Sequence, residues 1–184
     1  SRLAAAGIRR VRVEDLTPGQ DAFLGRLLSR EILPILTPIA VSPDRPFPVL
    51  AGLRINLLVR FRQGPEAKEE PRSAVVTMPK ALARFLTLPV EDGYHFMLLE
   101  DAVARFAGQL FPGETALETV PFRIIRNADM AVREDQAADL LEEMKEVLVE
   151  RKLGACVRLE IADRASAAAL GVLRDVFDIP ADRT

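Results

Sequence analysis

The chain has 184 residues and a formal net charge of -2, with 49% hydrophobic and 28% charged residues. This length and composition predict one globular domain with a substantial core, and they exclude an intrinsically disordered protein. The near-neutral charge argues against a positive electrostatic field that would attract nucleic acid, so we expect no nucleic-acid partner.

Cysteine usage and hydropathy bear on the cellular compartment. The single Cys156 excludes an intramolecular disulfide, and its strand-like setting is that of a small buried apolar residue. No apolar run approaches the roughly 20 residues that a transmembrane helix needs, and no basic-then-apolar leader opens the chain. We therefore expect a cytoplasmic protein with no transmembrane segment.

Residues 1–48 predict a strand, a capped helix and a stiff connector. Residues 1–7 resemble the end of a helix closed by glycine, which suggests a segment cut from a longer chain. Residues 8–13 fit a short strand, and Thr17 to Gln20 forms a capping box with proline at the first helical position. That helix leads into residues 31–48, where five prolines exclude helix and apolar neighbours exclude a solvated linker.

A strand and its hairpin partner are predicted next. Residues 53–62 alternate apolar and polar side chains, which predicts a strand covered on one face only. Residues 72–78 fit its partner, and residues 63–71 between them fit an exposed tip. Residues 79–88 fit a short helix that ends before Pro89.

The second half of the chain mixes strands and helices without strict alternation. Residues 94–99 fit a strand that passes into a helix at Glu100 and Asp101, two acids well placed against the positive end of a helix macrodipole. Further strands are expected at 119–126 and 156–161, and further helices at 134–152 and from Ser166 to Phe177. We therefore expect an α+β fold, with a mixed β-sheet packed with α-helices in a single domain.

Few residues in the sequence suit catalysis. His95 is the single histidine and lacks an evident orienting partner, so we interpret it as a strand residue rather than a general base. One histidine and one cysteine cannot build a four-ligand zinc site. Gly108 to Gly113 has the glycine spacing of a P-loop but lacks its lysine. Glu143 and Lys145 match the E-x-K fragment of some metal nucleases, but residues two apart in a helix point to nearly opposite sides and cannot converge on one metal. We predict no catalytic, cofactor-binding or metal-binding residues.

Two charged features are candidates for contact with a ligand or partner. Helix 134–152 carries two acidic ladders at i,i+4 spacing, which suit a solvated face or, as the alternative, docking to a basic surface. The ladders are Asp135, Asp139 and Glu143, and Glu142, Glu146 and Glu150. Arg123 and Arg126 end a strand and are the candidate anion contacts, although alternation directs them to opposite faces and favours structural roles.

Several motifs occur in an order typical of one family. They are Pro34-Ile35-Leu36-Thr37-Pro38-Ile39-Ala40-Val41, Pro46-Phe47-Pro48, Asn56-Leu57, Leu99-Glu100-Asp101, Leu110-Phe111-Pro112-Gly113 and Phe122-Arg123-Ile124-Ile125-Arg126-Asn127-Ala128-Asp129. Over nearly the whole chain they resemble the middle, or head, domain of bacterial polyphosphate kinase of the first type. Ser42, where that family typically has aspartate, and Tyr94 to Leu98, where an arginine and a proline are expected, mark a divergent member.

The resemblance implies a parent enzyme that transfers the terminal phosphate of ATP reversibly to polyphosphate, through a phosphohistidine and with magnesium. In that family the catalytic histidines and nucleotide-binding arginines belong to two C-terminal domains. Residues 1–184 would then be a noncatalytic head domain beside the active-site tunnel, with residues 1–7 the end of a helical N-terminal domain. The implied partners are the other domains of the parent, a second copy in a homo-oligomer, and polyphosphate.

Two alternatives belong to other classes of function. A stand-alone anion-binding or protein-interaction module would use the arginines on polyphosphate or nucleotide. The second alternative is an unrecognised enzyme, and no group of candidate catalytic residues in the sequence supports it.

Overall fold

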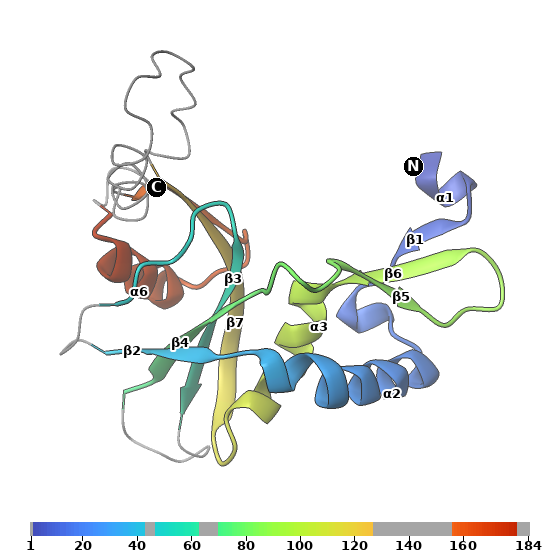
Figure 1. The fold of residues 1–184 in the computed structure, drawn as a ribbon, viewed down its shortest axis with the longest axis horizontal. Coiled ribbons are helices and arrows are strands. Elements are labelled where there is room, and N and C mark those ends of the chain that lie inside the picture. The colour runs from blue at the N-terminus through green and yellow to red at the C-terminus, as the bar shows by residue number, and fades with distance from the viewer. Residues whose placement is uncertain (1, 43–46, 63–69, 127–155, 180–184) are drawn as a thin grey trace, which may run out of the picture.

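The computed structural model describes residues 2–42, 47–62, 70–126 and 156–179, which form two β-sheets with helices packed on them (Figure 1). The larger sheet is antiparallel, and its strands lie in the order β2 (Pro38–Val41), β4 (Arg72–Thr77), β3 (Ile55–Arg62), β7 (Thr115–Arg126) and β8 (Cys156–Ile161). The smaller sheet has the order β1 (Ile8–Arg10), β6 (Tyr94–Leu98) and β5 (Phe85–Leu88). Only this sheet mixes strand directions, since β1 is parallel and β5 antiparallel to β6. The α+β class is confirmed, with two sheets in place of one.

The α-helices among the described residues are α1 (Arg2–Ala5), α2 (Pro18–Leu27), α3 (Leu99–Arg105) and α6 (Ala167–Phe177). Helices α6 and α3 lie on opposite sides of the large sheet, and α1 lies beside β1 of the small sheet (Figure 1). The predicted capping box of α2 is confirmed, because Thr17 Oγ1 accepts from the Gln20 N–H at 3.3 Å and Gln20 Oε1 accepts from the Thr17 N–H at 3.2 Å. The predicted start of α6 is also confirmed, since Ser166 caps it by accepting from the Ala169 N–H.

Strand β3 lies at the centre of the large sheet and is buried on both faces. Leu57 and Val59 pack into a core shared with α2, α3 and the small sheet, whereas Leu58 packs into a second core with α6. The expected one-sided strand is therefore wrong, because a helix from the distant end of the chain covers the second face. Leu53, expected within the strand, is an exposed residue with φ of 61°.

The proline-rich connector contains both helical and extended backbone. After α2, a π-helical turn at Leu28–Ile32 and a 3-10 turn at Leu33–Ile35 follow, so the exclusion of helix is wrong for these residues. Pro34 fits there because the first turn of a helix needs no N–H at that position. The extended part is β2, whose Pro38 begins an edge strand, where a missing N–H is tolerated.

The expected helix at 79–88 is also wrong, since Phe85–Leu88 is strand β5 and pairs with β6. A short isolated helix is marginal in water, and an adjacent strand with a free edge offers these apolar and β-branched residues ladder hydrogen bonds instead. The strand-to-helix passage at residues 94–99 is confirmed by β6 and α3. The predicted helix at 134–152, with both acidic ladders, and most of the hairpin tip, 63–69, lie outside the described residues.

Candidate functional site

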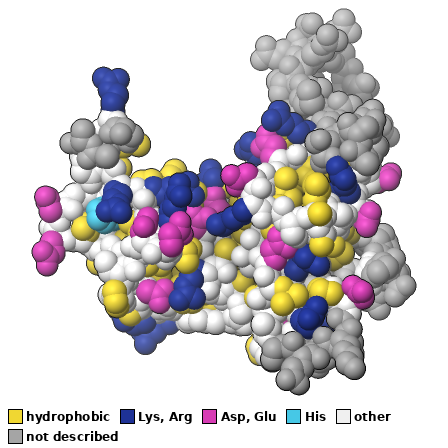
Figure 2. All heavy atoms as spheres, turned by 180° about the vertical axis from the view of Figure 1, so that it is seen from behind, with side chains coloured by type: hydrophobic (Ala, Val, Ile, Leu, Met, Phe, Trp, Pro, Cys, Tyr) yellow, Lys and Arg dark blue, Asp and Glu magenta, His cyan; other side chains and the backbone are white. Residues whose placement is uncertain are grey.

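The surface is hollowed where the two sheets meet. Two adjoining cavities, with volumes of about 530 and 320 Å³, share Arg84, Glu100, Pro121 and Ala162 in their linings. We call this continuous recess the inter-sheet hollow. Figure 2 shows acidic and basic side chains interspersed across the middle of the molecule on one face.

The inter-sheet hollow is charged but electrically balanced. Its lining contains five arginines, Arg10, Arg12, Arg84, Arg123 and Arg164, and five carboxylates, Glu14, Glu100, Asp101, Glu160 and Asp163. An anion site of high affinity concentrates positive charge in excess of negative charge. The balance here favours contact with another protein surface over capture of a polyanion.

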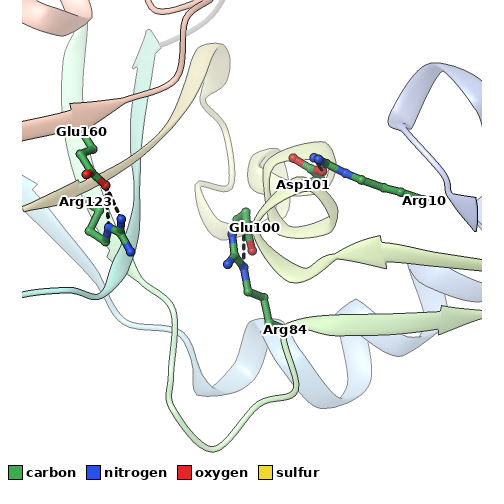
Figure 3. Close-up of polar contacts among 6 residues, drawn as sticks. All are labelled: Arg10, Arg84, Glu100, Asp101, Arg123 and Glu160. Carbon is green, nitrogen blue, oxygen red and sulfur yellow. Dashed lines mark hydrogen bonds and ion pairs between the residues drawn. The ribbon is translucent and has the colours of Figure 1, made fainter. Parts of the chain in front are cut away.

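The start of α3 anchors the centre of the hollow (Figure 3). The Leu99 N–H donates to the carbonyl oxygen of Arg84, which brings the Arg84 side chain beside Glu100. Arg84 Nε and Nη2 both donate to Glu100 Oε1, at 3.0 and 2.6 Å. Glu100 is thus held by an ion pair in addition to the macrodipole position that the sequence predicts.

Two further ion pairs flank this one (Figure 3). Arg10, at the end of β1, donates to Asp101 at 2.8 Å and so ties the small sheet to α3. Arg123 on β7 and Glu160 on β8 are directly opposite each other, and Arg123 Nε donates to Glu160 Oε2 at 2.8 Å. The arginines that point into the hollow in this view are therefore already bound to carboxylates.

The structure does not bring the two predicted anion contacts together. Arg123 faces the hollow, whereas Arg126 lies on the opposite face of β7, as alternation predicts. Arg126 is buried, and its Nε donates to the carbonyl oxygen of Leu50 at 3.1 Å. It lines a separate recess of about 300 Å³ together with Phe177 and Cys156. No single anion clamp forms from this pair.

A carboxylate network joins the large sheet to α6. Glu118 accepts from the Ser166 N–H at 2.8 Å, from Ser166 Oγ at 2.7 Å and from Arg60 Nη1 at 3.2 Å. Burial alone would raise the pKa of Glu118, but the hydrogen bonds from Ser166 and Arg60 outweigh it, and the pKa lies below its ordinary value of 4.5. Glu118 is consequently a charged structural residue at neutral pH.

The two residues best suited to nucleophilic or base chemistry are separated. Cys156 belongs to the large sheet, where burial raises the pKa of its thiol above the ordinary 9.0, and the backbone of Arg158 and the charge of Arg126 offset this only in part. His95 belongs to the small sheet and lines a recess beside Gln20.

In the described ranges, no group of three or more His, Cys, Asp or Glu side chains is arranged to hold a metal ion. No helix among the described residues has the length and apolar character to cross a membrane.

Sequence reasoning finds Glu100, Asp101 and Arg123 but misses Arg10 and Arg84 as residues of the hollow. Arg84 falls in the segment expected to be helical, so its place beside Glu100 follows only from the pairing of β5 with β6. Arg10 needs the parallel pairing of β1 with β6, which joins residues more than eighty positions apart. Neither pairing has a local sequence signal.

Comparison with known proteins gives a consistent result. Residues 19–184 match the family model described as the polyphosphate kinase middle domain. A polyphosphate kinase from Bacillus cereus is 38% identical over 181 residues, covering 96% of this chain and 26% of that protein. One from Halalkalibacterium halodurans is 40% identical over 179 residues, covering 96% and 25%. This chain thus spans about a quarter of the length of these curated relatives.

The fold is similar to part of a solved structure. The crystal structure of polyphosphate kinase from Porphyromonas gingivalis matches with a TM-score of 0.76 and 22% sequence identity. The match covers 99% of this chain and 25% of that one. At this identity the likeness concerns the fold alone.

Proposed function

Because this chain belongs to the polyphosphate kinase family and matches its middle domain, we propose that it acts as a noncatalytic support for a larger phosphotransferase. The parent would transfer the terminal phosphate of ATP reversibly to polyphosphate. In this proposal the chain supports the active-site tunnel and takes part in assembly of a homo-oligomer. Its partners are the other domains of the parent and a second copy, in a cytoplasmic enzyme.

The ion pairing of the inter-sheet hollow is the observation that carries this proposal. Arg10, Arg84 and Arg123 each contact a carboxylate, so the hollow is a preformed, charge-balanced surface. Polyphosphate would have to displace Glu160 from Arg123, which makes it a weaker partner here than a protein surface of matching charge. Such a surface suits packing between domains.

The side chains present do not fit the group that the family implies. Magnesium prefers several converging oxygen ligands, and the acids of the hollow are divided among arginines rather than gathered. We therefore assign ATP and Mg²⁺ to other parts of the parent and derive no catalytic step from these residues.

The proposal is tested by assaying the purified 184-residue chain with ATP, Mg²⁺ and a polyphosphate primer, with a full-length polyphosphate kinase as the positive control. We expect no polyphosphate product from the chain. Product formed by the chain alone, above a heat-denatured control, would overturn the support role.

Titration calorimetry with polyphosphate addresses the anion-binding alternative. We expect no micromolar binding. Salt-sensitive micromolar binding that Arg123→Ala or Arg126→Ala weakens would favour the stand-alone module over a support role.

A further inference from the structure

One side of the small sheet is aromatic and open to solvent. Phe85 on β5 and Tyr94 on β6 are 55% and 41% exposed, and their rings lie 5.3 and 6.1 Å from the ring of Phe96. We call this side, which carries Phe85, Tyr94 and Phe96, the aromatic face. None of the three rings belongs to either core of the described residues, whereas Leu88 and Met97 on the other side do. Exposed large apolar side chains that gather on one face are typical of a surface that another part of a protein covers.

Strand β1 extends the aromatic face. Its register with β6 places Ile8 beside Tyr94 and Arg10 beside Phe96, so these side chains share one side of the sheet. The match to the middle-domain model begins at residue 19, and β1 lies before it. One strand of the small sheet is therefore contributed by the part of the chain that precedes the matched domain.

The chain before β1 leaves the small sheet beside Tyr94. The Tyr94 N–H donates to the Gly7 carbonyl oxygen at 2.9 Å, and a Cβ at Gly93 would lie 2.5 Å from that oxygen, so the two glycines are in close contact. Helix α1 comes directly before this contact and lies beside β1 (Figure 1). A helix of four residues is marginal in water, and its Leu3 is 57% exposed. Helix α1 therefore lacks a packing partner of its own among the described residues.

We propose that the aromatic face binds apolar side chains from the part of the parent kinase that precedes residue 1 and continues from α1. The inference rests on the proposed function, in which this chain packs against other domains. It assigns that packing to one partner and to one side of the small sheet, with Phe85 and Tyr94 as the side chains that become buried.

The positions of the two flanks favour this partner over a following domain. The preceding part starts from α1 at the small sheet, whereas the chain beyond Ile179 starts from α6, which packs on the large sheet at the other end of the molecule (Figure 1). This chain spans about a quarter of the length of its curated relatives, so the parent has ample further sequence.

The charges around the aromatic face favour an apolar partner. Residues 85–88 carry no charge. The nearby cations Arg10 and Arg84 are already paired with Asp101 and Glu100, so they call for no acidic partner. A surface with an apolar centre and balanced charges at its rim suits burial against apolar side chains.

The test uses Tyr94 as the probe, because it is the one tyrosine of residues 1–184. Tetranitromethane nitrates exposed tyrosine rings, and mass spectrometry of the peptide that contains Tyr94 gives the rate. The isolated chain is compared with the intact parent kinase, with a parent shortened to begin at residue 1, and with a parent shortened to end at Thr184. We expect nitration about tenfold slower in the intact parent and in the form that ends at Thr184. The form that begins at residue 1 should react as fast as the isolated chain.

Substitutions in the intact parent give a second measurement. Phe85→Glu places a charge on the aromatic face and should restore fast nitration of Tyr94, with Phe85→Ser in its place if that variant fails to fold. Leu117→Glu is the matched control, because Leu117 is 47% exposed on β7 of the large sheet, and it should leave nitration slow. Slow hydrogen exchange in β3 identifies the forms that are folded.

Equal nitration of Tyr94 in the isolated chain and the intact parent would overturn the inference. Slow nitration that persists in the form beginning at residue 1, or that is lost in the form ending at Thr184, would overturn it as well, because a following domain would then be the cover. A rate that rises when the intact parent is diluted would assign the cover to a second copy instead. All these results leave the support role intact, whereas polyphosphate made by the isolated chain contradicts that role whatever the nitration rates are.

Discussion

The two sheets of this molecule differ in how completely they are covered. In the large sheet Leu57 and Leu58 point to opposite faces and are both 0% exposed, because α6 covers one face and α2 and α3 lie on the other. In the small sheet Leu88 and Met97 are buried, whereas Phe85 and Tyr94 remain 55% and 41% exposed. The large sheet is therefore covered on both faces within the chain, whereas the small sheet keeps exposed apolar side chains that the proposed packing against other domains would cover.

The largest difference in stability loss is expected between truncating a side chain in the core of the large sheet and truncating one on the exposed face of the small sheet. Leu58→Ala removes a fully buried side chain next to α6 and should lower the free energy of unfolding by about 3 kcal/mol. Phe85→Ala removes a ring that is half exposed and touches Phe96, and should lower it by about 1 kcal/mol. Urea unfolding of both variants measures the difference. Equal losses would mean that the exposed face of the small sheet contributes as much to stability as the buried face of the large sheet.

A substitution at Gly93 should destabilise the small sheet selectively. This residue has φ of 83°, and a Cβ there would lie 2.5 Å from the Gly7 carbonyl oxygen, which accepts from the Tyr94 N–H. Gly93→Ala should therefore lose about 2 kcal/mol or more, since the clash adds to the strain of a left-handed residue. Hydrogen exchange should quicken in β1 and β6 and remain slow in β3.

Gly113→Ala is the control for that experiment. Gly113 has φ of 81°, but a Cβ there would meet nothing within 4 Å. Strain alone should lower stability by about 1 kcal/mol. If the two glycine variants lose the same stability, the contact between Gly7 and Gly93 does not matter for the small sheet.

Helix caps give a smaller, matched comparison. Thr17→Ala removes the cap of α2 and should lower stability by about 1 kcal/mol. Ser166→Ala removes the cap of α6 and in addition the hydroxyl that donates to Glu118, so it should lower stability by more than Thr17→Ala. Thermal or urea unfolding measures both. A larger loss from Thr17→Ala would contradict the importance of the α6 attachment.

The last prediction concerns Glu118 and is the one whose size depends on pH. Its pKa is lowered in the folded chain, so the charged carboxylate stabilises the fold above the ordinary pKa of 4.5, and this contribution disappears as pH falls through the lowered value. Glu118→Gln should be about 1 kcal/mol less stable than the unmodified chain at pH 7. The gap should close in unfolding curves measured at progressively more acidic pH. A gap that grows on acidification would have the wrong sign.

The local features of the fold could be predicted from the sequence. The capping box at Thr17, the cap at Ser166 and strand β8 all depend on residues close together in the chain, where propensity and hydrogen bonding act directly. Strand β5 and the second buried face of β3 could not be predicted. Both depend on partners far away in sequence, which no local pattern reveals.

The candidate site follows the same division. Glu100 and Asp101 are recognisable from their position at a helix start, and the opposite directions of Arg123 and Arg126 follow from strand alternation. The ion pairs of Arg10 and Arg84 needed the structure, because the pairing of β6 with β1 and β5 creates them. Topology therefore determined the position of the hollow, and the residue types determined the charge of its lining.

Hydrogen exchange measured on this chain alone and within the intact parent kinase tests the support role most directly. If the chain packs against other domains through the small sheet and the hollow, amides of residues 94–101 and 162–164 should exchange at least about tenfold more slowly in the parent, which corresponds to about 1.4 kcal/mol of added protection. Amides of β3 and β4 should exchange at the same rate in both. Equal rates throughout, or protection confined to the large sheet, would contradict the account.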